Sequence, residues 1–249
     1  MTRNTLCMTG ILAVLGLAGL AQADQILYEN NFQSRTLGNE WSSNSVLSDG
    51  EDGEIFTRFN GRYTNEATIL TLTAVSNPGG IGNESDGGGS DGGHGGGDGG
   101  GGGGGGGGAQ RVVYTLEFDF YAIDSWDGNY TGNGPDTFEV LRDNEMLFSE
   151  TFANTHTGQS FRQPDIGPEN LGFSPAWKDS VYRDISVTFE IPDDAETFSL
   201  RFRGVGLQSM IDESWGIDNV TVSYSVVPAP ATLSAGGLML LLSTRRRRS

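Results

Sequence analysis

The chain has 249 residues, with 32 acidic and 15 basic side chains and a formal net charge of −17. A surface this acidic repels nucleic acid and anionic lipid, so we expect neither as a partner. The charge is compatible with Ca²⁺ loading, with a saline habitat or simply with high solubility. The single cysteine, Cys7, excludes a disulfide scaffold, so stability must come from a core, from bound ions, or from both.

The first 23 residues have the three parts of a secretory signal peptide. Arg3 supplies a positive charge, residues 11–20 are apolar, and Ala21-Gln22-Ala23 is a small-residue cleavage site. We therefore expect cleavage after Ala23. The alternative is a signal anchor, but the apolar stretch is short for a stable membrane span. Cys7 precedes the apolar stretch, which argues against a lipoprotein signal.

Residues 24–226 are the expected folded domain, and their number suits one all-β unit. Without both ends, 10 basic residues remain against 32 acidic ones, and the net charge falls to near −22 (10 − 32). The only lysine is Lys178. Apolar runs rich in strand-forming residues predict the first strands at 26–28, 55–59 and 68–75.

A glycine-rich segment, residues 79–108, then interrupts the strand pattern. It contains 21 glycines among 30 residues and ends in ten consecutive glycines. Backbone entropy opposes any fixed conformation of such a segment. The alternative is a Gly-Asp calcium repeat, which requires a regular spacing that this segment lacks. Because strand patterns lie on both sides, we expect a disordered insertion in a loop of one domain.

The clearest strand pattern is 112–123, where one face is formed by Val112, Tyr114, Leu116, Phe118 and Phe120. A hairpin is predicted around Asp143-Asn144, a long surface loop at 158–175, and further strands at 183–191, 197–203 and 215–224. Eight or nine short strands without an amphipathic helix predict an antiparallel β-sandwich of the jelly-roll kind. We expect its core to contain five phenylalanines: Phe118, Phe120, Phe138, Phe189 and Phe202.

Two stretches, 123–128 and 212–220, place carboxylates where a strand meets a loop. In the second, the apolar alternation changes parity after Ile217, which predicts a β-bulge near Asp218-Asn219. Clustered aspartates at loop ends can supply the six to eight oxygens that Ca²⁺ requires. The candidate ligands are Asp124, Asp127, Asp136, Asp212 and Asp218. The alternative is that Asp124 and Asp218 accept hydrogen bonds from backbone amides without a metal.

Aromatic side chains supply the candidate ligand-binding residues. If exposed, Trp126, Tyr130 and Trp177 could stack on sugar rings, and Trp41 is a weaker candidate. A sandwich normally buries its tryptophans, so we expect Trp41 and Trp215 in the core.

The same two stretches resemble those of lectin-like jelly-roll modules of secreted bacterial proteins. The shared motifs are Ile-Asp-Ser-Trp-Asp at 123–127 and Trp-Gly-Ile-Asp-Asn-Val at 215–220. The resemblance covers most of residues 112–224. It implies a concanavalin-type or carbohydrate-module sandwich, often with structural Ca²⁺, and it implies no particular ligand.

Catalysis is not expected. Concanavalin-like glycosidases carry Glu-x-Asp-x-x-Glu on a strand, whereas this chain has Glu117-x-Asp119-x-x-Ala122 and lacks the second glutamate of the acid/base pair. A degenerate glycoside hydrolase remains the alternative function. The two histidines, His94 and His156, lie in the glycine-rich segment and in a predicted loop, which suits neither a hydrolytic triad nor a zinc site.

The last 23 residues, 227–249, combine a Pro-x-Pro break, an apolar run and a basic end. The break is Pro228-Ala229-Pro230, the apolar run extends from 233 to 242, and the end is Arg245, Arg246, Arg247 and Arg248. The run is short for a permanent span, and arginines stay on the cytoplasmic side. The alternative is an ordinary basic-ended hydrophobic C-terminus.

This arrangement resembles the PEP-CTERM sorting tail of exported bacterial proteins, with Ala229 in place of the glutamate. The resemblance implies transient membrane insertion, processing by an exosortase-type transpeptidase, and delivery to the cell surface or its exopolysaccharide. We therefore expect a non-enzymatic surface or matrix protein that binds polysaccharide or packs as a structural component of the matrix.

Overall fold

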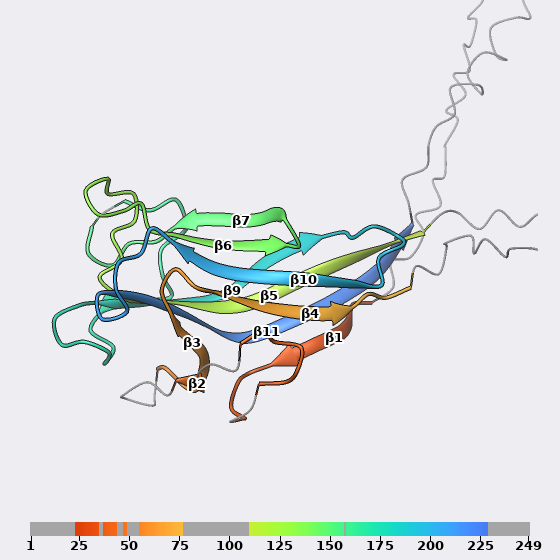
Figure 1. Ribbon diagram of the computed structural model, residues 1–249, viewed down its shortest axis with the longest axis horizontal. Helices are drawn as coiled ribbons and strands as arrows, with labels where there is room; N and C mark the ends of the chain where they lie inside the picture. Colours follow the sequence, from red (N-terminus) through yellow and green to blue (C-terminus); the bar gives the residue numbers. More distant parts are fainter. Residues whose placement is uncertain are drawn as a thin grey trace, which may run out of the picture.

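The computed structural model describes residues 23–34, 37–43, 47–48, 55–76, 110–156 and 158–228 (Figure 1). The predicted signal peptide before Ala23, the glycine-rich insertion and the tail beyond Pro228 lie outside these residues. The described part is all-β and consists of two antiparallel sheets without a helix. Within it, no helix has the length and hydrophobicity needed to cross a bilayer.

The larger sheet has seven strands. Their order is β2-β3-β11-β5-β9-β8, and β1 pairs with β11 on the same edge as β3 but further along the strand. The strands are β1 (Gln25–Asn30), β2 (Leu47–Ser48), β3 (Phe59–Tyr63), β5 (Gln110–Asp124), β8 (Ile166–Glu169), β9 (Asp179–Phe189) and β11 (Glu213–Pro228).

The smaller sheet has four strands in the order β4-β10-β6-β7. They are β4 (Ala67–Thr73), β10 (Thr197–Val205), β6 (Thr137–Arg142) and β7 (Glu145–Thr151). The predicted hairpin is confirmed, because β6 and β7 pair on either side of Asp143-Asn144.

The main core lies between the two sheets. The predicted alternation of β5 is confirmed, since Phe118 and Phe120 are buried and meet aromatic rings of the smaller sheet. The ring centroids of Phe120 and Phe138 are 4.2 Å apart, and those of Phe118 and Phe202 are 5.6 Å apart. Such pairs stabilise beyond the area they bury. All five phenylalanines expected in the core are buried, as are Trp41 and Trp215.

A second, smaller core covers the outer face of the larger sheet. It comprises Phe56, Phe59, Tyr121, Ile123, Leu171 and Val181. This core explains why β5 is buried on both faces from Phe118 onward, where simple alternation would expose every second side chain. Segments far apart in the chain, around residues 56 and 171, provide the cover.

The β-bulge predicted in the last strand is confirmed. The register of β11 against β5 shifts between Asp218 and Thr221, and Asn219 has a left-handed φ of 49°. Asparagine tolerates this conformation better than most residues. The bulge brings Val220 and Val222 back to the buried face after the change of parity.

Two of the predicted element boundaries are wrong. Residues 55–58 are not a strand, since Phe56 packs in the outer core and β3 begins at Phe59. The predicted loop 158–175 contains β8, which pairs only with β9 at the edge of the sheet. Pro168 is tolerated there because an edge strand does not need every amide. The short strand β2 was not predicted.

The sandwich has two distinct ends, which β5 and β11 connect (Figure 1). At one end Glu213 pairs with Asp124, and at the other Pro228 pairs with Gln110. We call the first the loop end, because the loops 125–136, 170–178 and 206–212 gather there. We call the second the tail end, because the described chain stops there at Pro228.

Candidate functional site: a buried carboxylate cluster at the loop end

Three buried carboxylates meet at the loop end, and we refer to them as the carboxylate trio. They belong to Asp127, Asp136 and Glu213, and one oxygen from each lies within 4.8 Å of the others. Asp127 is 5% exposed, and the other two are fully buried. The trio joins both sheets, because Glu213 begins β11 and Asp136 directly precedes β6.

Backbone amides hold two of these carboxylates in place. Asp136 Oδ2 accepts a short hydrogen bond from the Asp127 amide, and Glu213 Oε2 accepts one of 2.7 Å from the Gln208 amide. The second oxygens, Asp136 Oδ1 and Glu213 Oε1, are buried and accept no hydrogen bond from a donor of the described residues, although the two carboxyl groups lie close enough to share a proton. Buried polar atoms without a partner are rare and require an explanation.

The electrostatics of the trio favour a cation or bound protons. Burial raises the pKa of Glu213, and the charges of Asp136 and Asp127 raise it further. Burial likewise raises the pKa of Asp136, with the Asp127 charge acting in the same direction. Close carboxylates without protons or a cation between them repel each other. The residues therefore fit a hard divalent cation, for which carboxylate oxygens are the preferred ligands.

Asp127 also connects the trio to a neighbouring loop. Its Oδ1 lies 3.2 Å from Nε2 of His156, and its backbone forms an isolated β-bridge with Ala153. The ring of His156 stacks on that of Tyr130, with centroids 4.3 Å apart. The trio thus lies next to a pair of stacked rings, one from the loop after β5 and one from the segment after β7.

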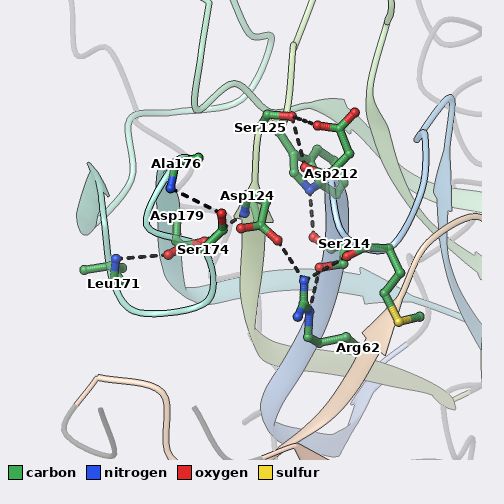
Figure 2. Close-up of polar contacts among 12 residues, drawn as sticks. Arg62, Asp124, Ser125, Leu171, Ser174, Ala176, Asp179, Asp212 and Ser214 are labelled. Atoms are coloured by element: carbon green, nitrogen blue, oxygen red, sulfur yellow. Dashed lines mark hydrogen bonds and ion pairs between the residues drawn. The ribbon is translucent and has the colours of Figure 1, made fainter. Parts of the chain in front are cut away.

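Asp124 belongs to a separate cluster around Arg62 (Figure 2). The Arg62 guanidinium donates to Asp124 Oδ2 over 2.7 Å, to Ser214 Oγ over 2.9 Å and to the Met210 carbonyl over 2.8 Å. Burial raises the pKa of Asp124 to about 6, although Arg62 opposes the shift. Asp124 therefore forms a partly buried ion pair with Arg62 and does not join the trio, and its Oδ1 has no hydrogen-bond partner among the described residues.

Asp179 completes this cluster and was not predicted from the sequence. It is fully buried, and its Oδ1 and Oδ2 accept hydrogen bonds from the backbone amides of Asp124 and Leu171, over 2.8 and 3.0 Å. Asp179 thereby ties the loop before β9 to the end of β5 (Figure 2).

Asp218 lies away from both clusters, in the bulge of β11. Its Oδ1 accepts a hydrogen bond from the Asn219 amide, and its Oδ2 accepts from Tyr121 Oη over 3.0 Å and from Thr57 Oγ1 over 3.1 Å. Burial raises the pKa of Asp218 to about 6. For this residue the structure agrees with the metal-free alternative.

The structure therefore brings together only two of the five predicted ligands, Asp127 and Asp136. Asp212 is adjacent in sequence to the trio, but its Oδ1 accepts a hydrogen bond from Ser125 Oγ. The third member of the trio, Glu213, was missed. Its parity could have revealed it, because Glu213 shares the parity of Trp215 and Ile217, which pack in the main core.

The predicted aromatic ligand-binding residues divide into one buried and two exposed side chains. Trp126 is fully buried, and its Nε1 donates to the Ser214 carbonyl over 2.7 Å, so this candidate does not meet the condition of exposure. Tyr130 is 48% exposed and Trp177 is 37% exposed, both at the loop end. Trp41 is buried and donates to Tyr28 Oη.

Of the two acidic residues in the incomplete glycosidase motif, one is exposed and the other is buried and hydrogen-bonded. Glu117 is exposed. Asp119 is buried, and its two oxygens accept hydrogen bonds from the Asp184 amide and from Asn219 Nδ2. Of the predicted sorting residues, Ala23 and Pro228 are described and exposed, and the others lie beyond the described residues.

Comparison with known proteins adds little to this geometry. No family model matches the sequence, and no curated protein matches it. Among solved structures, the chain is similar to dimeric latent PorU from Porphyromonas gingivalis, with a TM-score of 0.43 and 9% sequence identity. The match covers 87% of this chain and 14% of the PorU chain. So distant a likeness carries no functional argument.

Proposed function

We propose that this chain is an exported cell-surface or matrix protein whose jelly-roll sandwich binds extracellular polysaccharide without cleaving it. Residues 1–23 would direct export, and residues 227–249 would be processed by an exosortase-type enzyme after transient membrane insertion. The Ca²⁺ that the resemblance implies would be held by the carboxylate trio, with no role for Asp124 or Asp218.

The observation that supports this proposal best is that the two ends of the sandwich carry different features. Pro228, the last described residue, lies at one end, whereas the carboxylate trio and the exposed rings of Tyr130 and Trp177 lie at the opposite end. The two ends are separated by the length of β11, which has 16 residues, or roughly 50 Å at the usual rise of a strand. A protein tethered by its tail would therefore present the loop end outward.

The proposed Ca²⁺ would have a structural role. It would take up the unpartnered oxygens of Asp136 and Glu213 and hold β11, β6 and the loop after β5 together. Waters or backbone carbonyls would complete the six to eight ligands that the ion prefers.

Binding and turnover can be tested together. The purified protein is incubated with β-glucans and algal polysaccharides, and both pull-down and the release of reducing ends are measured. We expect binding without new reducing ends. Product formation that Glu117→Gln abolishes would replace the proposal with the hydrolase alternative. A protein that neither binds nor cleaves any polymer would leave only a structural role in the matrix.

Processing of the two ends needs its own measurement. Intact-mass spectrometry of the protein recovered from its native surface should give a mass that begins at Asp24 and lacks Arg245–Arg248. Recovery of the full-length chain from the cytosol would contradict export.

A further inference from the structure

The strongest unexplained feature outside the carboxylate trio is a pair of hollows at the loop end. One hollow, of about 450 Å³, is lined by Ala153, His156, Gly158, Gln159, Gln163 and Pro168. The other, of about 200 Å³, is lined by Asn154, Thr155, Ala176, Trp177 and Lys178. Both are lined by residues of the segment 153–159 and by residues from 163–178, and we call the two hollows together the loop-end groove.

Asn154, which lines the smaller hollow, carries a buried acceptor without a partner. Asn154 is 4% exposed, and its Nδ2 donates to the carbonyls of Ala122 and Asp124 over 2.9 and 2.7 Å. These two bonds fix the amide orientation. Its Oδ1 has no hydrogen-bond partner among the described residues. A ligand that donates a hydrogen bond, such as a hydroxyl group, would satisfy this oxygen.

Beside this acceptor lies an unpaired cation. Lys178 is exposed, is the only lysine of the chain, and forms no ion pair in the described structure. Its neighbour Asp179 does not neutralise it, because that carboxylate is buried and accepts from two backbone amides. The carboxylates of the trio, of Asp124 and of Asp179 are buried at this end of the sandwich, whereas the Lys178 side chain is exposed.

The third component of the hollow is an aromatic face. Trp177, at 37% exposure, offers part of its indole to solvent next to Lys178. The larger hollow is lined by His156, whose ring stacks on that of Tyr130, a side chain that is 48% exposed. Aromatic rings combine an apolar face with a polar edge and suit ligands that share both properties, as sugar rings do.

From these three features we propose that the loop-end groove binds a polysaccharide whose sugars carry anionic groups, with Lys178 selecting the anion. The sugar ring packs on Trp177, a hydroxyl donates to Asn154 Oδ1, and the carboxylate or sulfate accepts from the Lys178 ammonium. The adjoining hollow at His156 receives the next part of the chain. This inference rests on the proposed polysaccharide binding and adds the site and the class of sugar.

The experiment uses the full chain with free Ca²⁺ held constant at physiological ionic strength. The probes are short oligouronates, the same oligomers after carboxyl reduction, a sulfated galactan and its desulfated form. Titration calorimetry measures each affinity for the parent protein and for Lys178→Gln, Lys178→Arg and Trp177→Ala. Arg111→Gln is the matched control, because it removes one positive charge at the tail end, on an exposed side chain paired with Glu190.

We expect Lys178→Gln to weaken binding of an anionic probe by about tenfold or more, since hydrogen bonds to charged groups are the strong ones. Lys178→Arg and Arg111→Gln should retain the affinity, and Trp177→Ala should lose binding of anionic and neutral probes alike. The probe whose affinity falls in Lys178→Gln, uronate or sulfate, identifies the anionic group that the site selects.

Two results would overturn the inference in different ways. Equal binding of anionic and neutral probes, unaffected by Lys178→Gln, would remove the anion selectivity and leave polysaccharide binding intact. Absence of binding to every probe, with a normal melting temperature, would remove the groove and the proposed function together.

Discussion

Glu213 and Asp124 are register partners at the loop end of β11 and β5, yet their carboxylates belong to different clusters. Glu213 lies with Asp127 and Asp136, whereas Asp124 bonds to Arg62 and has a left-handed φ of 69°. Residues that face each other in a ladder normally project to the same side. Because the backbone of Asp124 is left-handed, its carboxylate turns toward Arg62 and does not join the carboxylate of Glu213 in the trio.

The first prediction concerns the trio. Ca²⁺ should raise the melting temperature by several degrees, because an ion that binds only the folded state stabilises it. Glu213→Gln should abolish this increase without lowering stability in EDTA, since it replaces a group whose pKa is already raised by burial. Differential scanning calorimetry with and without EDTA measures both effects. Glu117→Gln, at an exposed site, is the control. Identical melting curves with Ca²⁺ and with EDTA would remove the metal site.

The second prediction concerns the buried ion pair. Arg62→Met should destabilise the protein by about 3 kcal/mol, because it leaves the buried Asp124 carboxylate without its cation. Arg62→Met with Asp124→Asn should recover part of this loss, since no uncompensated charge then remains. Urea unfolding of the single and double variants gives the coupling. Additive losses would contradict a direct interaction.

The third prediction concerns pH. The folded-state pKa of Asp218 is raised to about 6, above that of an unfolded aspartate near 4. Its protonation therefore contributes stability that is complete below about pH 4 and is lost as the pH rises through 6.

Asp218→Asn should consequently match the parent protein at pH 4 and exceed its stability at pH 7 by about 1–3 kcal/mol. The measurement is the difference in unfolding free energy between the two proteins at each pH, in EDTA. Asparagine can keep the acceptor for the Asn219 amide while its amide donates to Thr57 or Tyr121. A difference that does not change between pH 4 and 7 would show that Asp218 does not titrate as expected.

The fourth prediction distinguishes the two tryptophans that were both expected to bind ligand. Trp126→Phe should cost about 2–4 kcal/mol, because it leaves a cavity and removes the bond to the buried Ser214 carbonyl. Trp177→Phe should change stability by less than about 0.5 kcal/mol, as exposed substitutions usually do. Chemical denaturation measures both values, and comparable losses would contradict the assignment of one ring to the core and the other to the groove.

Much of the fold follows from short-range patterns in the sequence. The alternation of 112–120, the Asp143-Asn144 hairpin and the parity change at Asp218 all reflect the two-residue period of a strand. They were confirmed because neighbouring residues alone determine which side chains share a face. The same reasoning placed Asp127 and Asp136 at the ends of strands, where the structure brings them together.

Only the tertiary structure decided the burial and the partners of the side chains where strands end. Asp124 turns to Arg62, which lies 62 positions earlier. Trp126 is buried where it contacts Ser214 of β11 and Phe152, which directly follows β7. The groove likewise combines Asn154 with Trp177 and Lys178, which no local pattern relates. Alternation is a property of consecutive residues, whereas burial and charge pairing at strand ends depend on segments that folding brings together from distant parts of the chain.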